Sequence, residues 1–135
     1  GHGALTLALR HPGLFKSLSA FAPICAATQC QWGTKALSHY LGADTSPWQG
    51  YDASALIANA ASPAYPAGIL VDQGLADQFL LAQLKPELLE QACAAGHQPL
   101  TLRRHAGFDH GYYFVQTFME DHLRFHHGQL RTAAH

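Results

Sequence analysis

The sequence lacks the features of a membrane protein and of a nucleic-acid-binding protein. No apolar run approaches the roughly 18 residues that a helix needs to cross a bilayer, and no apolar segment precedes a secretory cleavage site. Positive charge is not in excess, because 8 Lys and Arg stand against 9 Asp and Glu, for a formal net charge of −1. We therefore expect no membrane and no nucleic-acid partner.

Cysteine pairs and charged residues are also scarce. The three cysteines are odd in number and have no C-x-x-C spacing, which is typical of free thiols in a reducing compartment, so we expect a cytoplasmic protein. Charged residues make up 13% of the 135 residues and apolar residues 48%, which predicts one globular domain with a sizeable core. There is neither an internal repeat nor a low-complexity tract.

The segments that are present alternate between helical and strand-like patterns. The pattern predicts, in order, a helix over residues 3–10, a strand over 15–22, an irregular segment over 23–66, a strand over 69–71 that Gly74 ends, a helix from Pro86 to Gly96, a strand over 99–104 and a helix over 111–127. The segment 23–66 is rich in aromatic residues and predicts a packed lid with two short helices, over residues 35–41 and from the N-cap Asp52 to about residue 59. Alternating strands and helices predict a parallel sheet.

Three strands make a narrow sheet, and no strand precedes the first helix. We therefore expect an α/β fold in which residues 1–135 form the C-terminal part of a single, doubly wound domain. In such sheets, ligands bind beyond the carboxyl ends of the strands.

Ionisable residues follow two of the predicted strands. Asp72 and Asp77 follow the strand over 69–71, and His105, Asp109 and His110 follow the strand over 99–104. An acid after one strand and a His after the next can meet at one edge of the sheet, as the orienting acid and the base of a Ser–Asp–His triad do in α/β-hydrolases.

The nucleophile of such a triad is absent from the sequence, which contains no G-x-S-x-G motif. The Ser of that motif stands on a sharp turn before a helix, where small residues are needed. The chain starts with such residues, Gly1, Gly3 and Ala4, followed at once by an apolar helical pattern. We therefore expect the nucleophile to lie upstream of Gly1, so that this chain alone would be inactive.

Several segments resemble the C-terminal half of the S-formylglutathione hydrolase (esterase D) family. They are "CQWGTKA", "DQGLADQFL" and "FDHGYYF", and "GHGAL" is similar to the residues that follow the nucleophile in that family's G-H-S-x-G-G-H-G-A motif. The resemblance implies an α/β-hydrolase fold, with Asp77 as the triad acid and His110 as the triad base. It also implies hydrolysis of the thioester S-formylglutathione to formate and glutathione, in formaldehyde detoxification, by a cytosolic homodimer that needs no metal or organic cofactor.

Each candidate residue has an alternative interpretation. Asp72 competes with Asp77 as the triad acid, and Asp109 suits the N-terminus of the last helix. Trp32, a candidate for substrate binding from its place in "CQWGTK", is otherwise a packing residue of the lid. His122 and His126 have the i, i+4 spacing of a zinc-binding pair, but neither an H-E-x-x-H pattern nor a third ligand supports a metal site.

The sequence therefore predicts a serine thioesterase that acts on a small-molecule thioester. A broad short-chain carboxylesterase and a catalytically inactive truncated product remain as alternatives.

Overall fold

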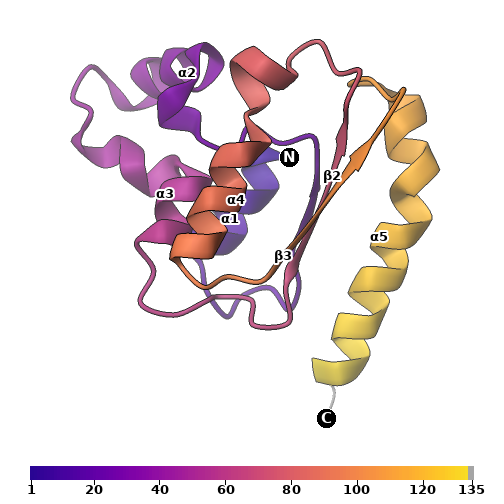
Figure 1. Ribbon diagram of the computed structural model, residues 1–135. Coiled ribbons are helices and arrows are strands. Elements are labelled where there is room, and N and C mark those ends of the chain that lie inside the picture. Colours follow the sequence, from indigo (N-terminus) through magenta and orange to yellow (C-terminus); the bar gives the residue numbers. More distant parts are fainter. Residues whose placement is uncertain (134–135) are drawn as a thin grey trace.

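The computed structural model describes residues 1–133, in which a parallel sheet is packed between two layers of helices (Figure 1). The strands are β1 (Ser19–Phe21), β2 (Ile69–Gly74) and β3 (Leu100–His105), in the order β1-β2-β3. One face of the sheet is covered by α1 (His2–Arg10), α3 (Ala53–Ala58) and α4 (Pro86–Ala95), and α5 (Tyr112–Ala133) lies along the other face. The predicted α/β fold with three parallel strands is confirmed.

The central strand β2 is buried along its whole length. All six of its residues are buried, and it pairs in parallel with both neighbours, with Leu70 opposite Ser19 in β1 and Thr101 in β3. A strand that is covered on both faces needs a continuous apolar run, which is the pattern that Ile69, Leu70 and Val71 show.

The first strand is much shorter than the sequence predicts. Only Ser19–Phe21 pair with β2, whereas a strand over residues 15–22 was expected. The reason is that β2 begins at Ile69, so the chain before Leu18 has no strand beside it, and Phe15 is 41% exposed. An apolar pattern therefore extended the predicted strand beyond the residues that have a pairing partner.

The segment 23–66 is largely helical. It contains two 3-10 helices (Ala27–Gln29 and Ser46–Tyr51), α2 (Gln31–Leu41) and α3. Helix α2 begins four residues before its predicted start, because the Cys30 sulfur accepts a hydrogen bond from the Gly33 N–H at 3.3 Å and caps it. The predicted N-cap of α3 is confirmed, since Asp52 accepts the Ala55 N–H at 3.0 Å. A lid role for this segment stays a prediction.

The start and stop residues predicted for α4 are confirmed, whereas α5 is longer than predicted. Pro86 opens α4 and Gly96 follows its last residue, whereas α5 continues beyond the predicted residue 127 to Ala133. A π-helical turn, Leu80–Leu84, connects the loop after β2 to α4 and was not predicted. Within residues 1–133, no helix combines the length and the apolar character that crossing a bilayer requires.

Two apolar clusters hold the layers together. The larger cluster joins α1, α3 and α4 to the sheet around Leu5, Val71 and Leu89, each with no exposed surface. The smaller cluster is centred on Phe114 of α5 and lies at the carboxyl end of the sheet. Because the smaller cluster includes Phe79 and Phe108, it packs the two loops that carry the candidate catalytic residues.

Candidate active site

Two loops meet at the carboxyl end of the sheet. The loop after β2 carries Asp77 and the loop after β3 carries His110. The Ala76 N–H donates to the Phe108 carbonyl at 2.9 Å and joins the loops. They can approach so closely because residue 74 is Gly, where a Cβ would lie 2.2 Å from the Phe108 carbonyl oxygen.

The side chains of Asp77 and His110 are in direct contact. Asp77 Oδ2 lies 2.7 Å from His110 Nδ1, as the order of the strands led us to expect. The Asp77 side chain is fully buried, whereas the His110 side chain is 41% exposed. With Nδ1 occupied by the carboxylate, Nε2 is the nitrogen left to exchange a proton with a reacting group. This geometry suits a base and its orienting acid, while the catalytic roles of both residues stay predictions.

Two further donors hold the Asp77 carboxylate. The Phe79 N–H donates to Oδ1 at 2.8 Å, and the Gln73 side-chain amide donates to Oδ2 at 3.2 Å. Three donors therefore surround a carboxylate that has no contact with solvent, and hydrogen bonds to its charged form compensate for its burial.

Asp72, the alternative acid, faces a different set of partners. It accepts two hydrogen bonds from Arg103, both at 2.7 Å, and it lies 2.8 Å from His105 Nε2 and 2.7 Å from His122 Nε2. Burial alone would raise the pKa of Asp72, but the hydrogen bonds from His122, Arg103 and His105 outweigh it and hold the pKa well below its ordinary value. The structure therefore pairs Asp77, and not Asp72, with His110.

Asp72 also belongs to a second Ser–His–Asp chain. Ser19 Oγ lies 2.8 Å from His122 Nδ1, and His122 Nε2 reaches Asp72. However, His122 is 3% exposed and stacks on the Phe21 ring at 3.8 Å, so its imidazole has no open face for a substrate. We interpret this chain as a structural connection between α5 and the sheet, which sequence reasoning missed because its members are 50 residues or more apart.

The pair of His residues considered for zinc is also occupied by protein groups. His126 contacts the hydroxyls of Ser17 and Ser19 at 2.6 and 2.8 Å. Burial, together with the nearby His122, lowers the pKa of His126. In the part of the chain that the structure describes, no group of three or more His, Cys, Asp or Glu side chains could hold a metal ion.

The cysteines do not supply a nucleophile. Cys25, Cys30 and Cys93 are buried free thiols. Burial raises the pKa of Cys25 to about 12 and that of Cys93 to about 11, so these two remain protonated at neutral pH. Because the thiolate is the reactive form, we interpret them as core residues.

A cavity of about 390 Å³ opens beside His110. It is bounded by the end of β1 and the start of α5, and its lining residues are Phe21, Ala22, His110, Gly111, Tyr112, Phe114 and Val115. Apart from the imidazole, these are mostly apolar or aromatic side chains, so the cavity suits a small, weakly polar group placed next to a base.

Trp32, near the start of α2, is separated from the His110 ring by the side chain of Phe79. Its ring packs on Phe79 with centroids 4.5 Å apart, and the Phe79 ring meets the His110 ring edge-on at 5.6 Å. Trp32 is 43% exposed, so one part of its ring packs and another part faces outward. Both interpretations of Trp32 are therefore compatible with its place, and its substrate-binding role stays a prediction.

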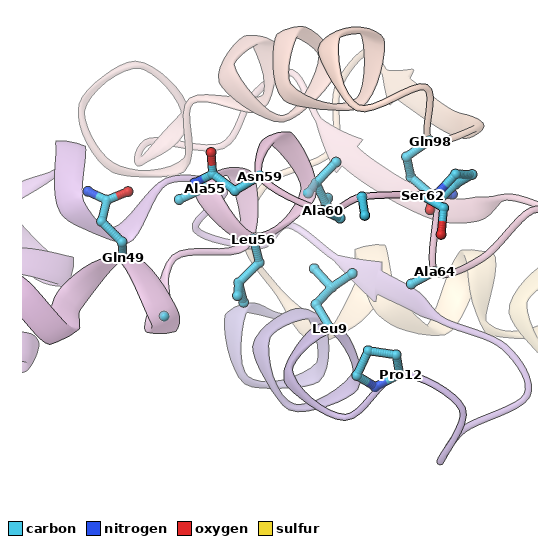
Figure 2. A pocket seen from close by; sticks show the side chains of 14 residues that line it. Leu9, Pro12, Gln49, Ala55, Leu56, Asn59, Ala60, Ser62, Ala64 and Gln98 are labelled. Atoms are coloured by element: carbon cyan, nitrogen blue, oxygen red, sulfur yellow. The ribbon is translucent and has the colours of Figure 1, made fainter.

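A larger cavity, of about 540 Å³, lies elsewhere, between the end of α1 and the segment that follows α3 (Figure 2). Leu9 and Pro12 bound it on one side, and Leu56 and Gln98 come from other elements. Its lining contains no His, Cys, acidic or basic side chain, so the hydroxyl of Ser62 on its wall has no neighbouring base in the lining to activate it as a nucleophile. We therefore place the candidate active site at Asp77 and His110.

Comparison with known proteins shows the family to which the chain belongs. A family model described as Putative esterase matches residues 1–125. An S-formylglutathione hydrolase from Arabidopsis thaliana is 50% identical over 129 residues, which are 96% of this chain and 44% of that protein. One from Bos taurus is 47% identical over 127 residues, or 93% of this chain and 44% of that protein.

A solved structure has the same fold. The S-formylglutathione hydrolase from Agrobacterium tumefaciens superposes with a TM-score of 0.90 at 49% identity, over 96% of this chain and 46% of that one. The resemblance to this family that the sequence predicts is confirmed. The chain spans about 44% of the length of the curated relatives from Arabidopsis and Bos.

Proposed function

We propose that this chain, which belongs to the putative esterase family, carries the acid and the base of a serine thioesterase that hydrolyses S-formylglutathione. The observation that supports this most directly is the 2.7 Å contact between buried Asp77 and half-exposed His110. Relatives about 50% identical are named S-formylglutathione hydrolases, which supports the choice of substrate.

The proposed reaction has two steps. A Ser hydroxyl attacks the formyl carbonyl of the thioester while His110 Nε2 takes its proton, and the glutathione thiolate leaves with that proton. Water then attacks the formyl-enzyme while the same imidazole takes a proton from it, the bond between the formyl carbon and the Ser oxygen breaks, His110 returns the proton to the Ser oxygen, and formate is released. Asp77 keeps the proton of His110 on Nδ1 and stabilises the imidazolium that forms in each step.

The nucleophile is proposed to come from a segment that precedes Gly1 in the natural protein. Gly1 lies against the end of β1, where a Cβ would be 2.7 Å from the Phe21 carbonyl oxygen. Phe21 and Ala22 also line the cavity at His110. A turn entering α1 would therefore approach the imidazole from that side, and a G-x-S-x-G motif in the codons upstream of Gly1 would support the proposal.

The preferred substrate tests the function. We expect kcat/KM of the natural protein to be at least roughly a hundredfold higher for S-formylglutathione than for a p-nitrophenyl ester with a twelve-carbon acyl chain, because the cavity beside His110, of about 390 Å³, is small for a long acyl chain. Steady-state kinetics with both substrates measures the ratio. Comparable values would favour the broad carboxylesterase, and no hydrolysis of either would favour a truncated, inactive product.

Trp32 is proposed to contact the substrate. We expect Trp32→Ala to raise KM for S-formylglutathione about tenfold with a smaller effect on kcat. The reason is that the bound substrate would lose its apolar contact with the Trp32 ring, which packs on Phe79. Tyr40→Ala is the matched control, since Tyr40 is an 81% exposed aromatic residue of the same helix, and it should change neither constant. Equal KM values for wild type and Trp32→Ala would leave only the packing interpretation.

The remaining properties of the proposed enzyme follow from the resemblance. The reaction needs no metal or organic cofactor, because Ser, His110 and Asp77 supply the nucleophile, the base and its orienting acid. We further propose a cytoplasmic homodimer that acts in formaldehyde catabolism.

A further inference from the structure

We infer that Gln73 is a positioning residue of the proposed triad: its amide N–H shares the Asp77 oxygen that binds His110 and thereby limits how strongly that oxygen attracts the imidazole proton. This inference rests on the proposed function for its catalytic consequence. It stands on geometry that is independent of the substrate.

Gln73 is placed for this role by β2. It is the penultimate residue of the strand and has no exposed surface, and its Nε2 donates both to Asp77 Oδ2 at 3.2 Å and to the Gly74 carbonyl at 3.0 Å. His110 Nδ1 reaches the same oxygen at 2.7 Å. Two donors therefore share Oδ2, whereas Oδ1 receives the Phe79 N–H.

The amide oxygen of Gln73 indicates that packing alone does not explain this residue. Gln73 Oε1 is buried and has no hydrogen-bond partner in the described part of the chain. An unsatisfied buried acceptor is unfavourable, and an apolar side chain of the same size would avoid it. The amide cannot turn around to relieve this, because Oε1 would then face the Asp77 carboxylate. Gln73 is thus a costly choice as a packing residue and a useful one as a donor.

The shared oxygen has a consequence for the base. A hydrogen bond from Gln73 spreads part of the negative charge of Asp77 onto a neutral donor, so less of it acts on His110. If this donor is lost, the carboxylate holds the imidazole proton more strongly. The protonated imidazole is then favoured at higher pH, where it cannot accept a proton from the nucleophile.

The test is Gln73→Met in the natural protein that contains this sequence. Met has a similar length and no donor, so it removes the hydrogen bonds to Asp77 and to the Gly74 carbonyl together with the unsatisfied acceptor. The first readout is the proton NMR resonance of the His110 Nδ1–H, assigned by its loss in Asp77→Asn, which should move downfield as the bond to Oδ2 shortens. The second is the pH profile of kcat/KM, whose acidic limb should move to higher pH, with about tenfold lower kcat/KM on that limb and nearly unchanged values on the plateau.

Gln98→Met is the matched control, because Gln98 is also a buried glutamine but is fully hydrogen-bonded away from the site. Its Nε2 donates to the Tyr65 and Pro99 carbonyls and its Oε1 accepts the Tyr65 N–H. We expect Gln98→Met to lower the melting temperature and leave the resonance and the pH profile unchanged. Gln73→Met removes an unsatisfied acceptor together with its bonds to Gly74 and Asp77, so it should lower the melting temperature less than Gln98→Met does, with both site readouts shifted.

An unshifted resonance and pH profile in folded Gln73→Met would overturn the inference. If that variant does not fold, Gln73→Glu replaces it: once ionised, its carboxylate places a second negative charge beside Asp77, so the acidic limb of the kcat/KM profile should move to higher pH, and a wild-type profile would overturn the inference. The two proposals fail in different ways. A wild-type protein that hydrolyses no ester contradicts the proposed function, while the resonance still decides the role of Gln73.

Discussion

Asp77→Asn is expected to lower kcat of the natural protein for S-formylglutathione by about 10⁴, as the loss of the orienting carboxylate does in serine-protease triads. The surroundings of Asp77 explain why an amide cannot replace it. Both oxygens face donors, with the Phe79 N–H at Oδ1 and the Gln73 and His110 groups at Oδ2. An Asn must turn its NH₂ group toward one of these sides.

Either orientation is unfavourable. With its NH₂ at the Oδ2 side, the Asn would make His110 Nδ1 an acceptor and move the imidazole proton to Nε2, so that Nε2 could not accept the proton of the nucleophile. With its NH₂ at the Oδ1 side, the Asn would oppose the Phe79 N–H and leave His110 a neutral, weaker partner. Steady-state kinetics with S-formylglutathione measures the loss.

Asp109→Asn is the control for this experiment. Asp109 is the exposed neighbour of His110 in the chain, so the same chemical change is made beside the base without touching its partner. We expect kcat to remain within about threefold of the wild type. If Asp77→Asn lost no more activity than Asp109→Asn, Asp77 would not be the acid of the triad.

Asp72→Asn should act on stability, lowering the free energy of unfolding at neutral pH by about 3 kcal/mol with a far smaller effect on kcat than Asp77→Asn. The fully buried Asp72 carboxylate joins Arg103 and His105 of β3 to His122 of α5. Removing its charge leaves cationic and polar partners without compensation in the interior. Urea unfolding monitored by circular dichroism gives the difference.

The pH dependence of this effect follows from the low pKa of Asp72 in the folded protein. A carboxylate whose pKa is depressed by folding stabilises the native state fully above its unfolded pKa, about 4. That stabilisation is lost as the pH falls through the folded value. The difference between the wild type and Asp72→Asn should therefore be complete above pH 4 and shrink below it.

Asp121→Asn is the control for stability. Asp121 contacts the same Arg103 at 3.0 Å, but its side chain is 48% exposed. An exposed ion pair contributes less than about 1 kcal/mol, so this variant should unfold almost like the wild type. If Asp121→Asn destabilised the protein as much as Asp72→Asn does, burial would not be what makes Asp72 important.

The sequence by itself determined the parts of this protein that follow local rules. Asp52 caps a helix, Pro86 opens one and Gly96 ends it because each acts on its own stretch of backbone. The contact between Asp77 and His110 spans 33 residues and was still predictable. Its predictability comes from topology, because the carboxyl ends of neighbouring parallel strands lie at one edge of the sheet.

Only the tertiary structure decided the bounds of those strands and helices that depend on a pairing or capping partner. The strand expected over residues 15–22 shrank to Ser19–Phe21 because β2 begins too late to pair with the rest. Helix α2 began early because the sulfur of Cys30, a residue with no usual preference for capping, accepts the N–H of Gly33 in its first turn. Propensity describes a segment alone, whereas pairing and capping depend on what lies beside it.

The tertiary structure also decided the partners of the buried polar side chains. Nothing in the spacing of Asp72 and His122, 50 residues apart, indicated that they would be 2.7 Å from each other. Nor did the sequence distinguish Gln73, which donates to Asp77, from Gln98, which holds a loop. A buried polar group must find its hydrogen-bond partner among whatever groups the packed layers bring within about 3 Å, and that neighbourhood exists only once the chain has folded.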